Sequence, residues 1–265
     1  MLARGRHVLV PDTVFHTALP TAATLLPLPP DARAQGLRRW GLHGLAVQSV
    51  VDLLPGLGDA VVVHLGHACS VTAVSGGMPR ATTAAVSPAG GVVSLTGSGD
   101  LDPEVVLRLV EVHGGSVAEV RQLLQRRSGV AGISGGRTDV AALLSAGDAA
   151  ADLAVQVLVR SVAMAVAAAV TTLDRWEGLV FTGGLGAGSP ELRERVCARL
   201  LPLRPGAAGL PGPPSEQLAG SGLEVLAVPV DEEAVLDRLA RAVGPAPGPR
   251  SGGRPSDRRS PAADR

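Results

Sequence analysis

The stretch that decides the fold is VFTGGLGAGSPELRERV, residues 180–196. An apolar strand end is followed by a corner with four glycines in residues 183–188, and then by Ser189, Pro190 and a run with helical periodicity. Such a corner is either a tight strand-to-helix turn or a loop whose backbone approaches a nucleotide phosphate or adenosine. The corner by itself leaves both alternatives open, so the rest of the chain has to decide.

The composition describes a chain with a large core and no excess of either charge. Of its 265 residues 46% are hydrophobic, and 24 basic residues balance 24 acidic ones. Nucleic acid and anionic membrane surfaces both require a basic face, so we expect neither as a partner. The N-terminus has no long apolar run of the signal-peptide type, and we expect a cytoplasmic protein.

Two further features support a buried core. The most apolar segment, residues 149–173, contains Asp152 and Arg160, which favours a buried helix over a membrane span. Cys69 and Cys197 lie far apart within apolar patterns, so we expect buried free thiols and no disulfide framework.

Strand and helix patterns alternate along the chain, with an antiparallel-looking meander over residues 58–87. Helix start signals are clear at Asp102, which precedes a proline, and at Ser116, which forms a capping-box pattern with Glu119. The sequence predicts one mixed α/β domain without internal repeats. Further strands are expected over 7–11, 176–184 and 223–230, a loop over 20–37, and helices from near 44 and over 101–115, 116–129, 138–148, 149–174, 189–201 and 231–243.

Seven motifs in order carry a resemblance to a known family. They are PDTVFHTALP (11–20), RRWGLHG (38–44), HLGHACSVTAVSGG (64–77), SGDLDP (98–103), SGVAGISGGRTD (128–139), VFTGGLG (180–186) and VPVDEEAV (228–235). Together they resemble the acetate kinase (acetate/propionate kinase) family over residues 8–243.

The resemblance implies the family's two-lobed fold, which is actin-like and sugar-kinase-like, with a ribonuclease-H-like mixed sheet and flanking helices in each lobe. Residues 1–243 resemble the C-terminal lobe, in which the last segment, 223–243, returns to the other lobe in the family. The N-terminal lobe has no counterpart in this chain. Residues 244–265 are rich in Pro, Gly and Arg, so we expect a disordered tail.

The resemblance also implies an activity: transfer of a phosphoryl group from ATP to acetate or another short-chain carboxylate, giving an acyl phosphate and ADP, with Mg²⁺. The resemblance implies a small-molecule carboxylate and a nucleotide as partners. Because the family forms dimers, it also implies a homodimer with a second copy of the chain. Asp12 and His43 match the family's catalytic aspartate and histidine. Nucleotide-binding positions match at His64, Gly66, Ser70, Gly136, Asp139, Gly183, Gly184 and Gly186, and the magnesium-linked acidic position matches at Glu232.

Each of these residues also has an ordinary structural interpretation. Asp12 can be a turn residue, His43 a structural histidine, and the glycine corner only a turn. Glu232 lies in a helix first turn, where acidic residues complement the helix dipole.

Several family positions are replaced. Gly97 stands in place of an arginine that contacts phosphate, and Val47 in place of a second histidine. Ala68 replaces a glycine and would disfavour a positive φ. Ala141 replaces another arginine, for which the nearby Arg137 is a candidate substitute.

Three interpretations follow. The chain is a family phosphotransferase, truncated and therefore weak or inactive by itself; or it is a remnant that binds nucleotide without turnover; or the true gene product begins upstream of Met1. Gly97, Val47 and the absent lobe favour the second interpretation over the first.

Overall fold

A computed structural model describes residues 7–243 of the chain. Its centre is a five-stranded mixed sheet in the order β3-β2-β1-β4-β5. β1, β2 and β3 form the antiparallel meander expected from the sequence, while β4 pairs in parallel with both β1 and β5. The strands are β1 (Ala60–Leu65), β2 (Cys69–Ser75), β3 (Met78–Thr82), β4 (Gly178–Thr182) and β5 (Glu224–Ala227).

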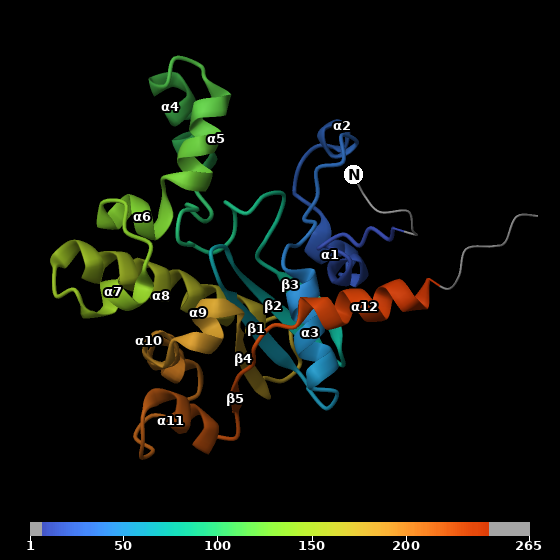
Figure 1. Ribbon diagram of the computed structural model, residues 1–265, viewed down its shortest axis with the longest axis vertical. Coiled ribbons are helices and arrows are strands. Elements are labelled where there is room, and N and C mark those ends of the chain that lie inside the picture. Colours follow the sequence, from blue (N-terminus) through green and yellow to red (C-terminus); the bar gives the residue numbers. More distant parts are fainter. Residues whose placement is uncertain (1–6, 244–265) are drawn as a thin grey trace, which may run out of the picture.

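Helices cover both faces of the sheet (Figure 1). On one face α8 packs against β1 and β2, and on the other α3 packs against β1 and is itself covered by α12. The helices are α1 (Thr21–Thr24), α2 (Pro30–Arg33), α3 (Gly44–Leu53), α4 (Pro103–Val112), α5 (Val117–Arg126), α6 (Gly129–Ser134), α7 (Val140–Ser145), α8 (Ala149–Val170), α9 (Gly183–Gly188), α10 (Pro190–Leu200), α11 (Pro214–Gly220) and α12 (Glu232–Ala242), with 3₁₀ turns η1 (Phe15–Ala18) and η2 (Leu201–Leu203).

The alternation of side chains along the strands divides the core in two. Val61, Val63 and Phe181 belong to the larger cluster under α8, whereas Val62 and Val180 belong to the smaller cluster under α3. All five side chains are fully buried. The sheet is therefore apolar on both faces, as expected for strands that pair in parallel at its centre.

The long apolar helix packs as the sequence predicts. Within residues 7–243, α8 is the one helix long and apolar enough to cross a membrane by length and composition. One of its sides, which includes Ala154, Leu158 and Val162, is buried in the larger core cluster. Cys69 and Cys197 are buried free thiols, as expected, and burial raises the pKa of each to about 12.

The helix starts were also predicted well. Asp102 accepts a hydrogen bond from the Glu104 N–H, and Ser116 accepts one from the Glu119 N–H. Each side chain thus satisfies a backbone donor that has no partner inside the helix.

Two expectations are wrong, and a third is not tested. Residues 7–11 form no strand and lie outside the five-stranded sheet; Leu9 is 95% exposed, and a strand requires a paired neighbour. The 20–37 loop contains the one-turn helices α1 and α2, and the short helices α6, α9 and α11 were not anticipated. The tail expected over 244–265 lies outside the described residues.

Candidate functional site

His43 lies at the start of α3 in an unusual backbone conformation. With φ 59° it is the one residue other than glycine with a positive φ in the part of the chain that the structure describes. The Asp12 carboxylate accepts a hydrogen bond from the His43 N–H at 2.6 Å. Left-handed conformations cost most residues about 1 kcal/mol, and such strain is concentrated at functional sites. Asp12 therefore holds His43 in a conformation that a free chain would populate little.

The ring of His43 is held from two further sides. Its Nδ1 lies 2.9 Å from the Ser70 hydroxyl oxygen on β2, and its ring stacks on that of His64 on β1, with centroids 4.3 Å apart. His64 and Ser70 are direct partners in the antiparallel β1–β2 pair, which places both beside the start of α3. Burial lowers the pKa of His43 against an opposing effect of the Asp12 charge, and burial together with His43 lowers the pKa of His64 to about 3. Both rings are consequently neutral at neutral pH.

Two buried side-chain atoms at this end of the sheet have no hydrogen-bond partner within residues 7–243. They are Nδ1 of His64 and the hydroxyl oxygen of Thr182, and the two residues are paired in register on β1 and β4. A buried polar atom without a hydrogen bond costs about 1–3 kcal/mol. Their position beside the glycine corner makes them candidates for contact with a polar ligand.

His16 was missed by the sequence interpretation, although it lies only four residues after Asp12 in the same motif. It is 1% exposed, its Nε2 lies 3.3 Å from the Thr72 hydroxyl, and its Nδ1 has no hydrogen-bond partner in the part of the chain that the structure describes. Burial lowers its pKa to about 4, and the charges of Asp12 and His43 act on it in opposite directions. Gly41 is required beside it, because a Cβ there would lie 2.5 Å from the His16 ring.

Glu232, at the start of α12, approaches Asp12 from the far end of the chain. Burial, and secondarily the Asp12 charge, raises the pKa of Glu232. No group of three or more His, Cys, Asp or Glu able to hold a metal is present in residues 7–243. The charges of Asp12 and Glu232 interact, and proteins commonly bind Mg²⁺ through one or two carboxylates, with waters and substrate phosphates completing the shell.

The glycine corner forms a short helix, α9, where a simple turn was one of the expected alternatives. Gly183 begins it with φ 80°, and a Cβ there would lie 2.5 Å from the Leu65 carbonyl oxygen. Gly184, by contrast, has open space around it. The Arg193 guanidinium donates to the carbonyl oxygens of Gly186 and Ala187 at 2.9 and 2.8 Å, which stabilises the end of α9.

The loop after β1 carries Ala68 where the resemblance expects a glycine. Ala68 does not adopt a positive φ, which agrees with the conformational limit that a Cβ imposes, and its effect on nucleotide binding stays a prediction. A Cβ at Gly66 would lie 3.3 Å from Nε2 of His64, a tight contact that a small shift of the ring would relieve.

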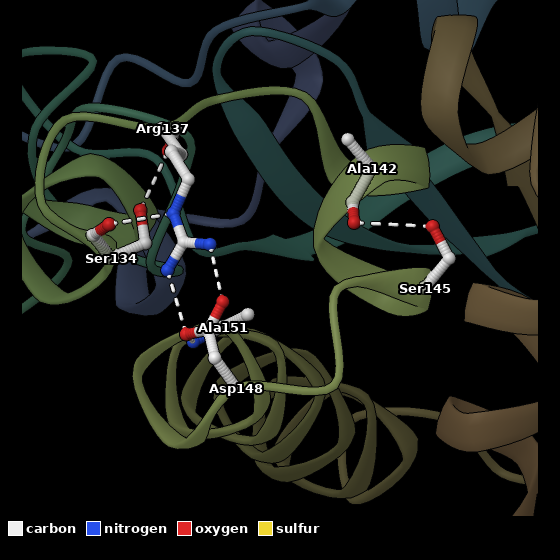
Figure 2. A network of polar contacts seen from close by, with 6 residues as sticks. All are labelled: Ser134, Arg137, Ala142, Ser145, Asp148 and Ala151. Carbon is white, nitrogen blue, oxygen red and sulfur yellow. Dashed lines mark hydrogen bonds and ion pairs between the residues drawn. The ribbon is translucent and has the colours of Figure 1, made fainter.

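Asp139 and Gly136 lie apart from the stacked rings of His43 and His64. Asp139 caps α7 by accepting from the Ala142 N–H at 3.1 Å, and Figure 1 shows α7 well separated from α3 across the molecule. Arg137 forms a two-pronged ion pair with Asp148 at 2.6 and 2.9 Å (Figure 2). Any ligand contact by Arg137 would compete with this pair.

The two positions at which family side chains are replaced, Gly97 and Val47, are both buried. Gly97 is buried, and a Cβ there would lie 2.7 Å from the Ser94 hydroxyl oxygen. Val47 is fully buried in the core beneath α3. An arginine or a histidine at these positions would require the surroundings to move.

Comparison with known proteins identifies the family. The model of the acetokinase family matches residues 1–204. The chain belongs to the acetokinase family. Acetate kinase from Rhodopseudomonas palustris is 35% identical over 239 residues, which cover 86% of this chain and 60% of that protein. Acetate kinase from Thermosynechococcus vestitus is 36% identical over 203 residues, covering 73% and 49%.

Solved structures of family members have the same fold. A propionate kinase from Francisella tularensis superposes with a TM-score of 0.74 at 27% identity, over 84% of this chain and 60% of that one. Acetate kinase from Porphyromonas gingivalis gives 0.76 at 26% identity, over 88% and 62%. The expected actin-like ATPase fold is confirmed, and the chain spans about half to two thirds of the length of these relatives.

The structure thus brings some of the expected site residues together. Asp12, His43, His64 and Ser70 meet around the start of α3, with Gly66 and Gly183 beside His64, and the charge of Asp12 acts on Glu232. Gly136, Asp139 and Gly97 are not among them.

Proposed function

We propose that this chain is the nucleotide-binding lobe of an acetokinase-family phosphotransferase. The reaction is attack of a short-chain carboxylate oxygen, such as that of acetate, on the γ-phosphorus of ATP. The bond from that phosphorus to the β,γ-bridging oxygen breaks, and an acyl phosphate and ADP are formed. The observation that carries the proposal is the oriented His43, held at its backbone by Asp12 and at its ring by Ser70.

Phosphoryl transfer needs positioning and electrostatic stabilisation of charge on the transferring oxygens. His43 would donate a hydrogen bond to that group, and the unpartnered His64 and Thr182 atoms would contact nucleotide phosphate oxygens. The backbone at Gly183 and Gly184 can approach a ligand closely because neither position carries a Cβ. Asp12 and Glu232 would hold Mg²⁺, which when bound neutralises phosphate charge and lowers the mutual repulsion of these carboxylates.

The chain by itself is expected to turn over weakly or not at all. Gly97 supplies no charge where the family has an arginine, and closure around substrate requires groups from two lobes. The buried setting of Gly97 favours a second candidate function, a protein that binds nucleotide without catalysis. A homodimer and a cytoplasmic location remain proposals from the family resemblance.

Calorimetric titration with Mg-ATP and Mg-ADP tests the proposal, followed by an assay for acyl-phosphate formation from ATP and acetate. Asp139→Asn removes a charge while keeping a side chain that caps α7, so weakened binding would implicate Asp139 in nucleotide contact. Saturable binding with acyl phosphate formation that is lost in His43→Gln supports the enzyme, and binding without turnover supports the second candidate. Absence of binding at millimolar nucleotide would refute both.

A further inference from the structure

The Ser70 hydroxyl is placed to control which nitrogen of His43 carries the proton. It was expected to contact nucleotide, but its oxygen lies 2.9 Å from Nδ1 of His43. Ser70 is 1% exposed, so its hydroxyl has little access to water. A buried hydroxyl usually donates its proton to a nearby acceptor, and within residues 7–243 the imidazole is the one hydrogen-bond partner found for it.

A neutral His43 ring carries one proton, on either Nδ1 or Nε2. Stacking on His64 at 4.3 Å favours a neutral imidazole, because two stacked imidazolium rings would repel each other; in the neutral ring one nitrogen donates and the other accepts. If Nδ1 accepts from Ser70, the proton must lie on Nε2. No hydrogen bond to His43 Nε2 is found in the described residues, so this N–H is available to a ligand.

We propose that Ser70 is a positioning residue that donates to Nδ1 of His43 and thereby keeps the proton on Nε2. The consequence for chemistry is specific. With the proton on Nε2, His43 donates a hydrogen bond to the transferring phosphoryl group; with the proton on Nδ1, Nε2 would be a bare base able to attack phosphorus. Ser70 thus selects the role of hydrogen-bond donor over that of nucleophile.

This consequence rests on the proposed function, whereas the tautomer can be measured without it. The full chain, ¹⁵N-labelled and without nucleotide, is examined near pH 7.5 by two-bond ¹⁵N–¹H correlation of its six histidines. The signals of His43 are those absent from His43→Gln. The wild type is expected to show a protonated Nε2 and an unprotonated, hydrogen-bonded Nδ1.

Two variants of Ser70 distinguish the effect of its hydroxyl group from the effect of side-chain size. Ser70→Ala is expected to give a mixture of tautomers, while Ser70→Thr, which keeps the hydroxyl and suits a strand, retains the Nε2–H form. The matched control is Ser49→Ala, another buried serine, whose hydroxyl oxygen accepts from the Asp231 N–H. It should leave the tautomer of His43 unchanged.

A wild-type His43 protonated on Nδ1, or a Ser70→Ala spectrum with the wild-type tautomer, would overturn the inference. Where acyl phosphate is formed, loss of this hydrogen bond should lower kcat about tenfold without raising KM for nucleotide. A chain that forms no acyl phosphate counts against the enzyme, and the tautomer of His43 still decides the role of Ser70.

Discussion

Replacing the buried His16 should flatten the dependence of stability on pH. Burial lowers the pKa of His16 from 6.5 to about 4 in the folded chain. Between these two pKa values the His16 ring is protonated in the unfolded chain and neutral in the folded chain. The stability contributed by the neutral ring is present in full above about pH 6.5 and is lost as the pH falls towards 4.

The size of the effect follows from these two values. Between pH 8 and pH 5 the linkage relation gives a loss of about 2 kcal/mol in the free energy of unfolding from His16 alone. His16→Gln removes this titration but keeps a side chain able to hydrogen-bond Thr72. The variant should therefore lose about 2 kcal/mol less than the wild type over the same range. His64, with a pKa lowered to about 3, contributes to both proteins and cancels in the comparison.

Urea unfolding at pH 8, 6 and 5 measures the difference, with His67→Gln as the control that removes an exposed imidazole. Equal losses between pH 8 and pH 5 in wild type and His16→Gln would refute the reasoning. Should the variant fold poorly, direct titration of the His16 ring by NMR in the wild type decides, and a folded pKa at or above 6.5 is the contradicting value.

Three other substitutions test the surroundings of the site. Gly183→Ala should destabilise the chain by about 1–3 kcal/mol in denaturant unfolding, because φ is 80° and the Cβ would meet a strand carbonyl; the adjacent, open Gly184→Ala should cost less than half as much. Arg137→Ala should raise the pKa of Asp148, measured by carboxyl NMR titration, since the Arg137 hydrogen bonds hold it well below its usual value; an unchanged pKa would mean that the pair in Figure 2 does not persist in solution. Gly97→Arg should lower the unfolding midpoint without increasing acyl-phosphate formation, because the position is buried, and a gain of activity at unchanged stability would show that the pocket for an arginine is still present.

Much of the fold could be read from local pattern. The meander, the buried β4, the helix starts at Asp102 and Ser116, and the burial of α8 each depend on residues within a few positions of one another. The failures were of two kinds. Segment 7–11 has the composition of a strand but lies outside the five-stranded sheet, and the short helices α6, α9 and α11 lie in stretches rich in Gly or Pro whose local preference is for turns.

The sequence by itself indicated the family, the five strands of the sheet, the longer helices and most of the residues that carry polar chemistry. Only the tertiary structure decided how those residues meet. Glu232 comes within the electrostatic influence of Asp12 because α12 packs on α3, and the Ser70 hydroxyl reaches His43 because the β1–β2 register sets it opposite His64. Helix and turn preferences arise from neighbours along the chain, whereas the direction of a side chain in a site depends on register and packing between segments far apart in sequence.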